Sequence, residues 1–280
     1  MALNNILKWF AGGFERCQAG TIDADGYFTG STGTPAATTG TGMLQLDANV
    51  AAVPSPTARS ITPEANDGKL GTIMLASIEP IQFELGLKSL NLTFSALVQG
   101  TNVYAEEEWS FVDFDPDTPT FRTMCLLFSR KSQSLVAATP GQGYEHLLLP
   151  NCQISFNGAG QLQTGTNEAT YNYSVTVDRA TKMPWGRTFS LTNDGTVASS
   201  GKVFFTESRF TMHAFTGDNS DVSVVVDYTP VSSTLNTNNL VYVTGTKATT
   251  DITISGKTFT WGAAPATAAK VVICYEHTMA

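Results

Sequence analysis

Apolar and polar residues alternate with period two over much of the chain after Thr72, and this pattern predicts β-strands. In 89–98, one face carries an apolar residue at every second position and the other face is mainly polar. Gly100-Thr101-Asn102 supplies a turn into 103–112, so the two segments are predicted to form a β-hairpin. The apolar face of the first strand would consist of Leu90, Leu92, Phe94, Ala96 and Val98.

The same alternation predicts further strands toward the C-terminus. It recurs in 170–177 and again in 222–228. The segment 252–261 has a Ser-Gly turn between two apolar-alternating runs and predicts a hairpin, and 271–275 predicts a closing strand. The S-G-K-T run within that hairpin resembles the end of a phosphate-binding loop, but a strand follows it instead of a helix. We therefore interpret it as a hairpin turn.

Helical spacing of apolar residues is confined to two places. Near the N-terminus it predicts a short docked helix, with Leu3, Ile6, Leu7, Phe10 and Phe14 on one face. The segment 121–135 also has a helical stripe, although its F-R-T-M-C-L-L-F run fits a buried strand as well. We favour a helix there.

The stretch from Thr21 to Gly71 has little periodicity of either kind. It is rich in Thr, Gly, Ala and Pro, which predicts an extended arm or loop. We therefore divide the chain into an N-terminal helix and arm (1–71), a core β-sandwich (72–216) and C-terminal β-hairpins (217–280). The last part either completes the sandwich or forms a small added domain.

The composition, with its many uncharged polar residues, suits a β-rich surface and also suits a surface that is buried against other copies of the chain. Only 14% of the 280 residues are charged, against about 25% in a typical globular chain. Charged residues are depleted at the cores of protein interfaces, so a low content suits a subunit that buries much of its surface. The net charge of −8 argues against tight binding to a phosphate backbone.

The sequence carries no pattern of a cofactor, metal or membrane-spanning segment. Its four cysteines are widely spaced, which predicts reduced, buried thiols, and no apolar run approaches the length of a membrane span. The N-terminus is a poor signal peptide, so we expect the product to stay in the cytoplasm where it is made. His146 is expected in a loop, as a structural residue instead of a catalytic one. We find no nucleophile paired with a base and expect no enzymatic activity.

Acidic residues gather in one stretch of the chain. The run 106–108 would lie in the middle of a strand, where charge guards an exposed edge or forms a surface that repels phosphate. A second group alternates like the start of a calcium loop, but Thr118 stands where such a loop needs glycine. The candidate acidic residues are Glu106, Glu107, Glu108, Asp113, Asp115 and Asp117.

Three segments together resemble the tail tube (major tail) proteins of long-tailed bacteriophages. They are SLNLTFSALVQGTNVYAEEEWSFV (89–112), PNCQISFNGAGQLQTGTNEATYNYSVTV (150–177) and DRATKMPWGR (178–187), and the likeness spans about 70–216. The likeness lies in the residue pattern of the segments and in their order along the chain, and no single motif in it is diagnostic. It implies a mainly β fold: an antiparallel two-sheet sandwich or barrel with one flanking helix and, here, a long extended N-terminal arm.

The resemblance also implies a function without catalysis or cofactors. Such subunits form stacked, hexameric rings in the virion tail and conduct DNA during ejection. Expected partners are further copies of the chain, tape measure, tail tip and terminator proteins, and DNA that passes without tight binding; no membrane is expected. The acidic candidates above would line the lumen, because negative walls repel phosphate.

Two other functions fit the same composition. The chain could be another virion component, such as a baseplate, head-completion or decoration protein. It could also be a carbohydrate-binding module that stacks sugars on Trp109, Trp185 or Trp261, although tryptophans on apolar strand faces more often belong to a core.

Overall fold

The computed structural model describes residues 14–32, 40–51, 58–61, 64–65, 68–69, 73–78, 80–106, 109–112, 122–133, 142–159, 170–188, 190–191, 195–196, 198–236, 239–249 and 251–278. The expected N-terminal helix lies almost entirely outside these residues. Among them, no helix is long and apolar enough to cross a membrane.

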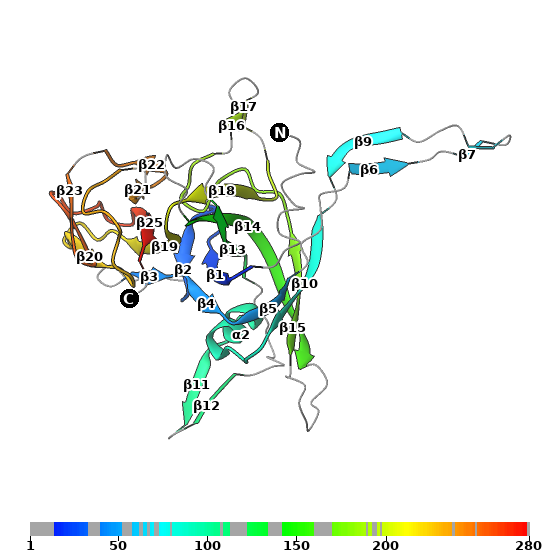
Figure 1. Cartoon of the computed structure of the whole chain (residues 1–280), viewed down its shortest axis with the longest axis horizontal. Helices are drawn as coiled ribbons and strands as arrows, with labels where there is room; N and C mark the ends of the chain where they lie inside the picture. Colours follow the sequence, from blue (N-terminus) through cyan, green and yellow to red (C-terminus); the bar gives the residue numbers. More distant parts are fainter. Residues whose placement is uncertain are drawn as a thin grey trace.

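A nine-stranded antiparallel sheet forms the centre of the molecule (Figure 1). Its strands run in the order β2-β1-β13-β14-β15-β10-β5, with β4 paired to β1 and β18 paired to β14. The bounds are β1 Arg16–Ile22, β2 Phe28–Gly30, β4 Leu44–Leu46, β5 Ala48–Ala51, β10 Ile81–Leu87, β13 Met124–Gln133, β14 Gln142–Ala159, β15 Tyr171–Val177 and β18 Lys202–Thr206.

The expectation of a helix near 121–135 is wrong, because this segment contains β13. Leu126 pairs with Leu149 and Phe128 with Leu147 of β14. The residues from Met124 to Phe128 are all buried, since core clusters pack on both faces of the strand. A run that is apolar at every position fits a strand buried between two layers as well as it fits the apolar face of a helix.

The expectation of a strand over 89–98 is also wrong. This segment contains the α-helix α2 (Leu92–Gln99), the one helix among the described residues. The Asn91 side chain accepts a hydrogen bond from the Phe94 amide, and Gly100 ends the helix in the left-handed conformation at φ 69°. Phe94, Leu97 and Val98 lie at helical spacing and enter the core on one face of the large sheet.

The segment 103–112 forms a complete hairpin by itself, instead of one strand paired with 89–98. Its strands are β11 (Val103–Glu106) and β12 (Trp109–Val112), and Glu106 lies opposite Trp109. Figure 1 shows the hairpin leaving the body of the molecule beside α2.

Two smaller sheets stack on the opposite face of the large sheet. A five-stranded sheet (β22-β21-β25-β19-β3) packs on it through one apolar cluster, and a three-stranded sheet (β20-β24-β23) packs on the five-stranded sheet through another. The bounds are β3 Thr41–Gly42, β19 Arg209–Thr216, β20 Ser223–Val225, β21 Asn239–Val243, β22 Thr246–Lys247, β23 Ile252–Ser255, β24 Thr258–Trp261 and β25 Lys270–His277.

Several predicted strands are confirmed. β15 buries Tyr173, Val175 and Val177, as the alternation predicts. The late hairpin is β23–β24, with Ser255 opposite Thr258, and the closing strand is β25. β25 pairs with β19 along its whole length, so residues on both sides of position 216 share one sheet.

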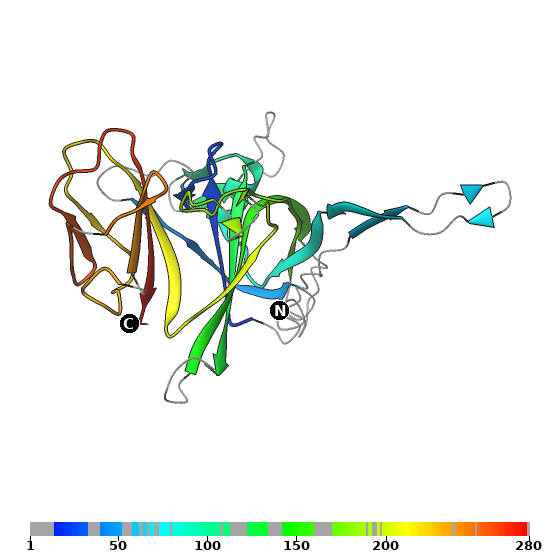
Figure 2. The same cartoon turned by 90° about the horizontal axis from the view of Figure 1, so that it is seen from above.

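The stretch 21–71 divides into two parts. The first contributes β2 to β5, which pair with β1, β10 and β19 and so belong to the layered body. The second contains β6 (Ala58–Ile61), which pairs with β9 (Ile73–Ile78), and the short pair β7 (Glu64–Ala65) and β8 (Gly68–Lys69). In both views these ribbons extend far from the body (Figures 1 and 2).

The prediction of a mainly β, antiparallel fold is confirmed. The sheets stack as layers of a sandwich and do not close on themselves in the part of the chain that the structure describes. One further two-stranded pair, β16 (Ser190–Leu191) and β17 (Gly195–Thr196), lies between β15 and β18 in the sequence.

Candidate interaction surfaces

The β11–β12 hairpin presents an exposed aromatic surface. Trp109 is 78% exposed, Tyr104 45% and Val103 41%. Tyr104 lies opposite position 111, two residues from Trp109, so both aromatics occupy the same face of the hairpin by register. Exposed large aromatic side chains on a projecting element are typical of binding surfaces.

Helix α2 gives this hairpin a firm base. The Phe94 ring packs edge-on against Tyr173 of β15 with 5.0 Å between ring centroids, and the Ser95 and Tyr173 hydroxyl oxygens lie 2.8 Å apart. All three side chains are buried. An eight-residue helix is too short to be stable alone, so this packing holds α2 and positions the strands that follow it.

The predicted acidic residues lie at or near this hairpin in the sequence. Glu106 ends β11, so the acidic run spans the end of a hairpin, and its expected place in the middle of a strand is wrong. Glu107 and Glu108 lie outside the described residues, as do Asp113, Asp115 and Asp117. The lumen-facing role of all six stays a prediction.

Of the three tryptophans considered as sugar platforms, Trp109 is the exposed one. Trp261 is 8% exposed and packs on Phe215 at 5.0 Å, as expected of a core residue. Trp185 stacks on Tyr242 with 5.9 Å between centroids. The expectation that Trp109 belongs to a core is wrong, because the hairpin carries it away from the sheets.

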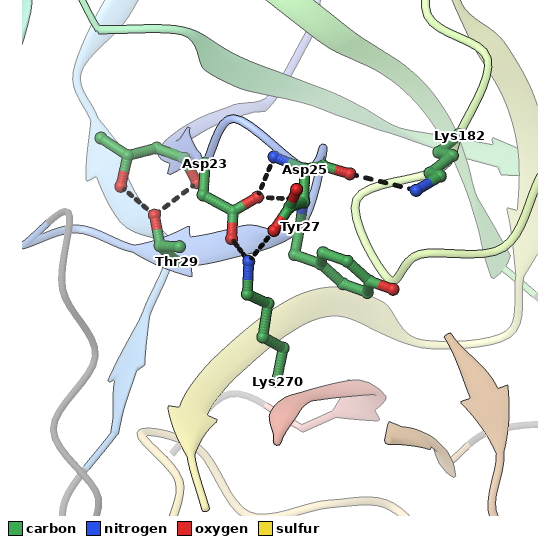
Figure 3. Close-up of polar contacts among 7 residues, drawn as sticks. Asp23, Asp25, Tyr27, Thr29, Lys182 and Lys270 are labelled. Carbon is green, nitrogen blue, oxygen red and sulfur yellow. Dashed lines mark hydrogen bonds and ion pairs between the residues drawn. The ribbon is translucent and has the colours of Figure 1, made fainter. Parts of the chain in front are cut away.

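The acidic turn between β1 and β2 of the large sheet is held to the five-stranded sheet by ion pairs (Figure 3). Between β1 and β2, Asp23 accepts hydrogen bonds from the amides of Asp25 (3.0 Å) and Tyr27 (2.9 Å), and Gly26 takes φ 85°. Lys270 of β25 forms ion pairs with both Asp23 and Asp25. The hydrogen bond from Lys270 lowers the pKa of Asp25. We call these three charged residues the intersheet clasp.

The aromatic ring of Tyr27 also contacts Lys270 and so stabilises the intersheet clasp. The Lys270 ammonium lies 5.1 Å from the ring centroid and that of Lys182 lies 5.6 Å from it, within the range of cation–π attraction. Sequence reasoning missed this site. The D-A-D-G turn signal marks the loop, but nothing in the sequence identifies the distant lysine that completes it.

His146 is a buried structural residue, although its expected place in a loop is wrong because it lies in β14. Its Nδ1 is 2.7 Å from the Ser129 hydroxyl and its Nε2 is 2.7 Å from the Thr206 hydroxyl. Burial, then the charge of Arg16, lowers the pKa of His146 to about 3. The Ser129–His146 pair resembles a nucleophile and base, but both residues are almost fully buried, so no substrate reaches them.

The described residues offer no cluster of metal-ligating side chains. All four cysteines are buried free thiols, as the sequence predicts.

No family model matches the sequence, and no curated protein is significantly similar to it. Among solved structures, one match is a chain from the sheath–tube complex of an extracellular contractile injection system in its extended state. The two chains share 7% sequence identity and a TM-score of 0.31, over 61% of this chain and 93% of that chain. A TM-score this low carries no argument, so the function must be argued from the residues and surfaces of the chain itself.

Proposed function

We propose that this chain is a structural subunit of a phage tail or tail-like particle. In this proposal it assembles into stacked, hexameric rings that form the tail tube and conduct DNA during ejection. It acts without catalysis or cofactors, in the virion tail, together with tape measure, tail tip and terminator proteins. The sequence resemblance over about 70–216 motivates the proposal.

The observation that carries the proposal is the aromatic hairpin. Burying an exposed tryptophan or tyrosine removes about 150–250 Å² of surface from water, worth several kcal/mol at about 25 cal/mol per Å². A monomer gains nothing from holding Trp109 at 78% exposure on a rigid base. A subunit that inserts this hairpin into a neighbour gains that burial at every contact.

The two-stranded ribbons and the low charge content support the same proposal. The β6–β9 ribbon leaves the body and has two outer edges whose backbone groups can pair with another chain. Because only 14% of the residues are charged, much of the polar surface is uncharged, and burying such groups with hydrogen-bond partners costs far less than burying charges. Both features suit an obligate assembly.

The acidic wall of the conduit is a second part of the proposal. The wall is proposed for the acidic stretch that consists of Glu106, Glu107, Glu108, Asp113, Asp115 and Asp117. Their replacement by lysine should leave assembly intact and slow DNA ejection, because phosphate would then adhere to the wall. Particles that carry these lysines and eject DNA at the normal rate would contradict the assignment.

Sedimentation velocity and negative-stain electron microscopy of the purified chain test the assembly. We expect rings or stacked tubes with a channel wide enough for duplex DNA, formed alone or after addition of a tail-tip complex. Trp109→Ala should weaken assembly without lowering the unfolding temperature, because its side chain supports no core. Val225→Ala is the matched control, since Val225 is 56% exposed on β20, away from the hairpin.

Trp109 also supports one alternative, a carbohydrate-binding module. An exposed indole can stack on a sugar ring. A monomer that binds glycans on an array and loses that binding in Trp109→Ala would favour this function over the tube. Assembly onto capsids or baseplates without stacking would instead identify another virion component.

A further inference from the structure

Strand β1 of the large sheet contacts strand β25 of the five-stranded sheet at both of its ends. At one end Asp23, which directly follows β1, pairs with Lys270 at the start of β25 in the intersheet clasp. At the other end, Nη1 of Arg16 at the start of β1 lies 2.8 Å from Nε2 of His277 at the end of β25. The two strands therefore run in opposite directions, with a polar contact at each end.

The hydrogen bonds of His277 require a neutral ring. Arg16 can only donate, so Nε2 of His277 must accept. Nδ1 of His277 lies 3.2 Å from the carbonyl oxygen of Thr278, which can only accept, so Nδ1 carries the proton. A second proton on Nε2 would place two donors 2.8 Å apart. The contact with Arg16 would then change from attraction to repulsion.

The side chain of His277 is enclosed, so water screens such a repulsion poorly. His277 is 1% exposed, and its ring stacks on that of Tyr228 with 4.2 Å between centroids. The guanidinium of Arg16 lies 5.3 Å from the centroid of the same tyrosine ring. Burial lowers the pKa of His277 to about 4, and the charges of Arg16 and Arg209 add to this effect. The hydrogen bond with the Thr278 carbonyl opposes it.

Charged and titratable groups surround this end of β25, but the charge in contact with His277 is positive. Glu15 pairs with Arg209 (2.8 Å), and Glu276 accepts a hydrogen bond from the Ser208 amide (2.8 Å). No carboxylate among the described residues forms an ion pair with His277. The surrounding groups are Glu15 before β1, Arg16 of β1, His146 of β14, Glu207 and Arg209 at the start of β19, Asp227 and Tyr228 after β20, and Tyr275 and Glu276 of β25.

The intersheet clasp at the opposite end responds to acid differently. The hydrogen bond from Lys270 lowers the pKa of Asp25 from its ordinary value of 3.8. The ion pair of Asp25 with Lys270 therefore persists at the pH at which His277 takes up a proton. Acid weakens the contact at the end of β25 before it weakens the contact at the start.

We propose that the Arg16–His277 contact is a proton-sensitive joint: acidification releases the end of β25 from the large sheet, while the intersheet clasp holds its start. In the open joint His277 meets water, and its pKa returns toward about 6.5. The closed joint binds that proton only near pH 4. The open form therefore gains population as pH falls from about 6.5 to about 4 and gains no more below that. The joint belongs to each subunit and stands apart from the proposed function.

Nuclear magnetic resonance of the histidine rings tests the joint directly. The chain has three histidines, so the resonance of His277 is the one missing in His277→Gln. In the wild type it should titrate near pH 4. In Arg16→Gln the proton affinity of His277 should rise at least about threefold, because the neighbouring like charge is gone.

Lys247→Gln is the matched control, since it removes an exposed positive charge from β22. The titration of His277 in this variant should match that of the wild type. A titration that is equally unchanged in Arg16→Gln would overturn the joint. This comparison needs no substitution at His277, so it decides the proposal even where His277→Gln lowers stability.

Hydrogen exchange shows where the protein opens. Residues 228–231 lie against His277, because Tyr228 stacks on its ring and position 230 forms a β-bridge with position 277. After correction for the intrinsic rate at each pH, exchange in 228–231 should accelerate about tenfold from pH 7 to pH 4.5. Exchange at the clasp, in 23–27, should not change.

The variant His277→Gln separates the joint from general acid unfolding. Glutamine offers Arg16 an acceptor that does not titrate, so exchange in 228–231 should no longer accelerate at pH 4.5. Acceleration that persists in this variant would overturn the proposal. Equal acceleration at both ends of β25 in the wild type would overturn it as well, because the clasp would then open together with the joint.

Discussion

Replacing Phe94 by alanine should loosen the base of the aromatic hairpin. Phe94 is fully buried in α2 and packs edge-on against Tyr173 at 5.0 Å. Truncating a buried phenylalanine costs about 3–5 kcal/mol, from lost burial and from the cavity left behind. For a chain of this size, that loss corresponds to a fall in unfolding temperature of about 6–10 °C.

Urea unfolding followed by circular dichroism measures this cost. Thr93→Ala is the control, because Thr93 is an exposed position of the same helix and should change stability by less than about 0.5 kcal/mol. Hydrogen exchange should also accelerate in β11 and β12, which follow α2 in the chain and pack against it.

A loss below about 1 kcal/mol for Phe94→Ala would refute this reasoning. It would mean that α2 is held by contacts other than its buried face, and that the hairpin is not anchored through Tyr173.

Three further predictions follow from the described residues. Gly30→Ala should destabilise the fold by at least about 2 kcal/mol in urea unfolding, because Gly30 has φ 78° and a Cβ there would clash with the Thr41 side chain. Asp25 has a lowered pKa in the folded protein, so its ion pair with Lys270 stabilises the fold above the unfolded pKa near 3.8, and this contribution is lost as pH falls through the folded pKa. Between pH 5 and pH 3 the wild type should therefore lose more stability than Asp25→Asn, and equal losses would refute the role of the clasp. The four buried cysteines should resist a thiol reagent until the protein unfolds, because burial raises each pKa, that of Cys125 to about 12; fast labelling of the native protein would contradict this.

Two segments, 89–98 and 121–135, carry short patterns that fit both a helix and a strand. In 89–98 a period-two pattern was present, yet Asn91 and Gly100 cap a helix and the polar residue Ser95 finds a buried partner in Tyr173. In 121–135 a helical stripe is present, yet apolar layers on both faces of β13 bury each position from Met124 to Ser129. The local pattern predicts secondary structure poorly where tertiary packing can bury either face of a segment.

The intersheet clasp and the position of the acidic run also depend on contacts between residues far apart in the chain, which no local pattern encodes. The turn at Asp23 was visible in the sequence, but Lys270 reaches it from the last strand. The acidic run was visible as well, but its place at the end of a hairpin depended on the pairing of Glu106 with Trp109.

The sequence by itself determined that this is a mainly β protein with buried free cysteines, a confirmed late hairpin and a closing strand. It did so because strand alternation and turn residues act over a few neighbouring positions. Only the tertiary structure decided that 92–99 is helical, that 124–133 is a central strand, and which distant charges meet. These outcomes depend on which layers cover each face of an element, and burial by residues far apart in the chain outweighs local preference.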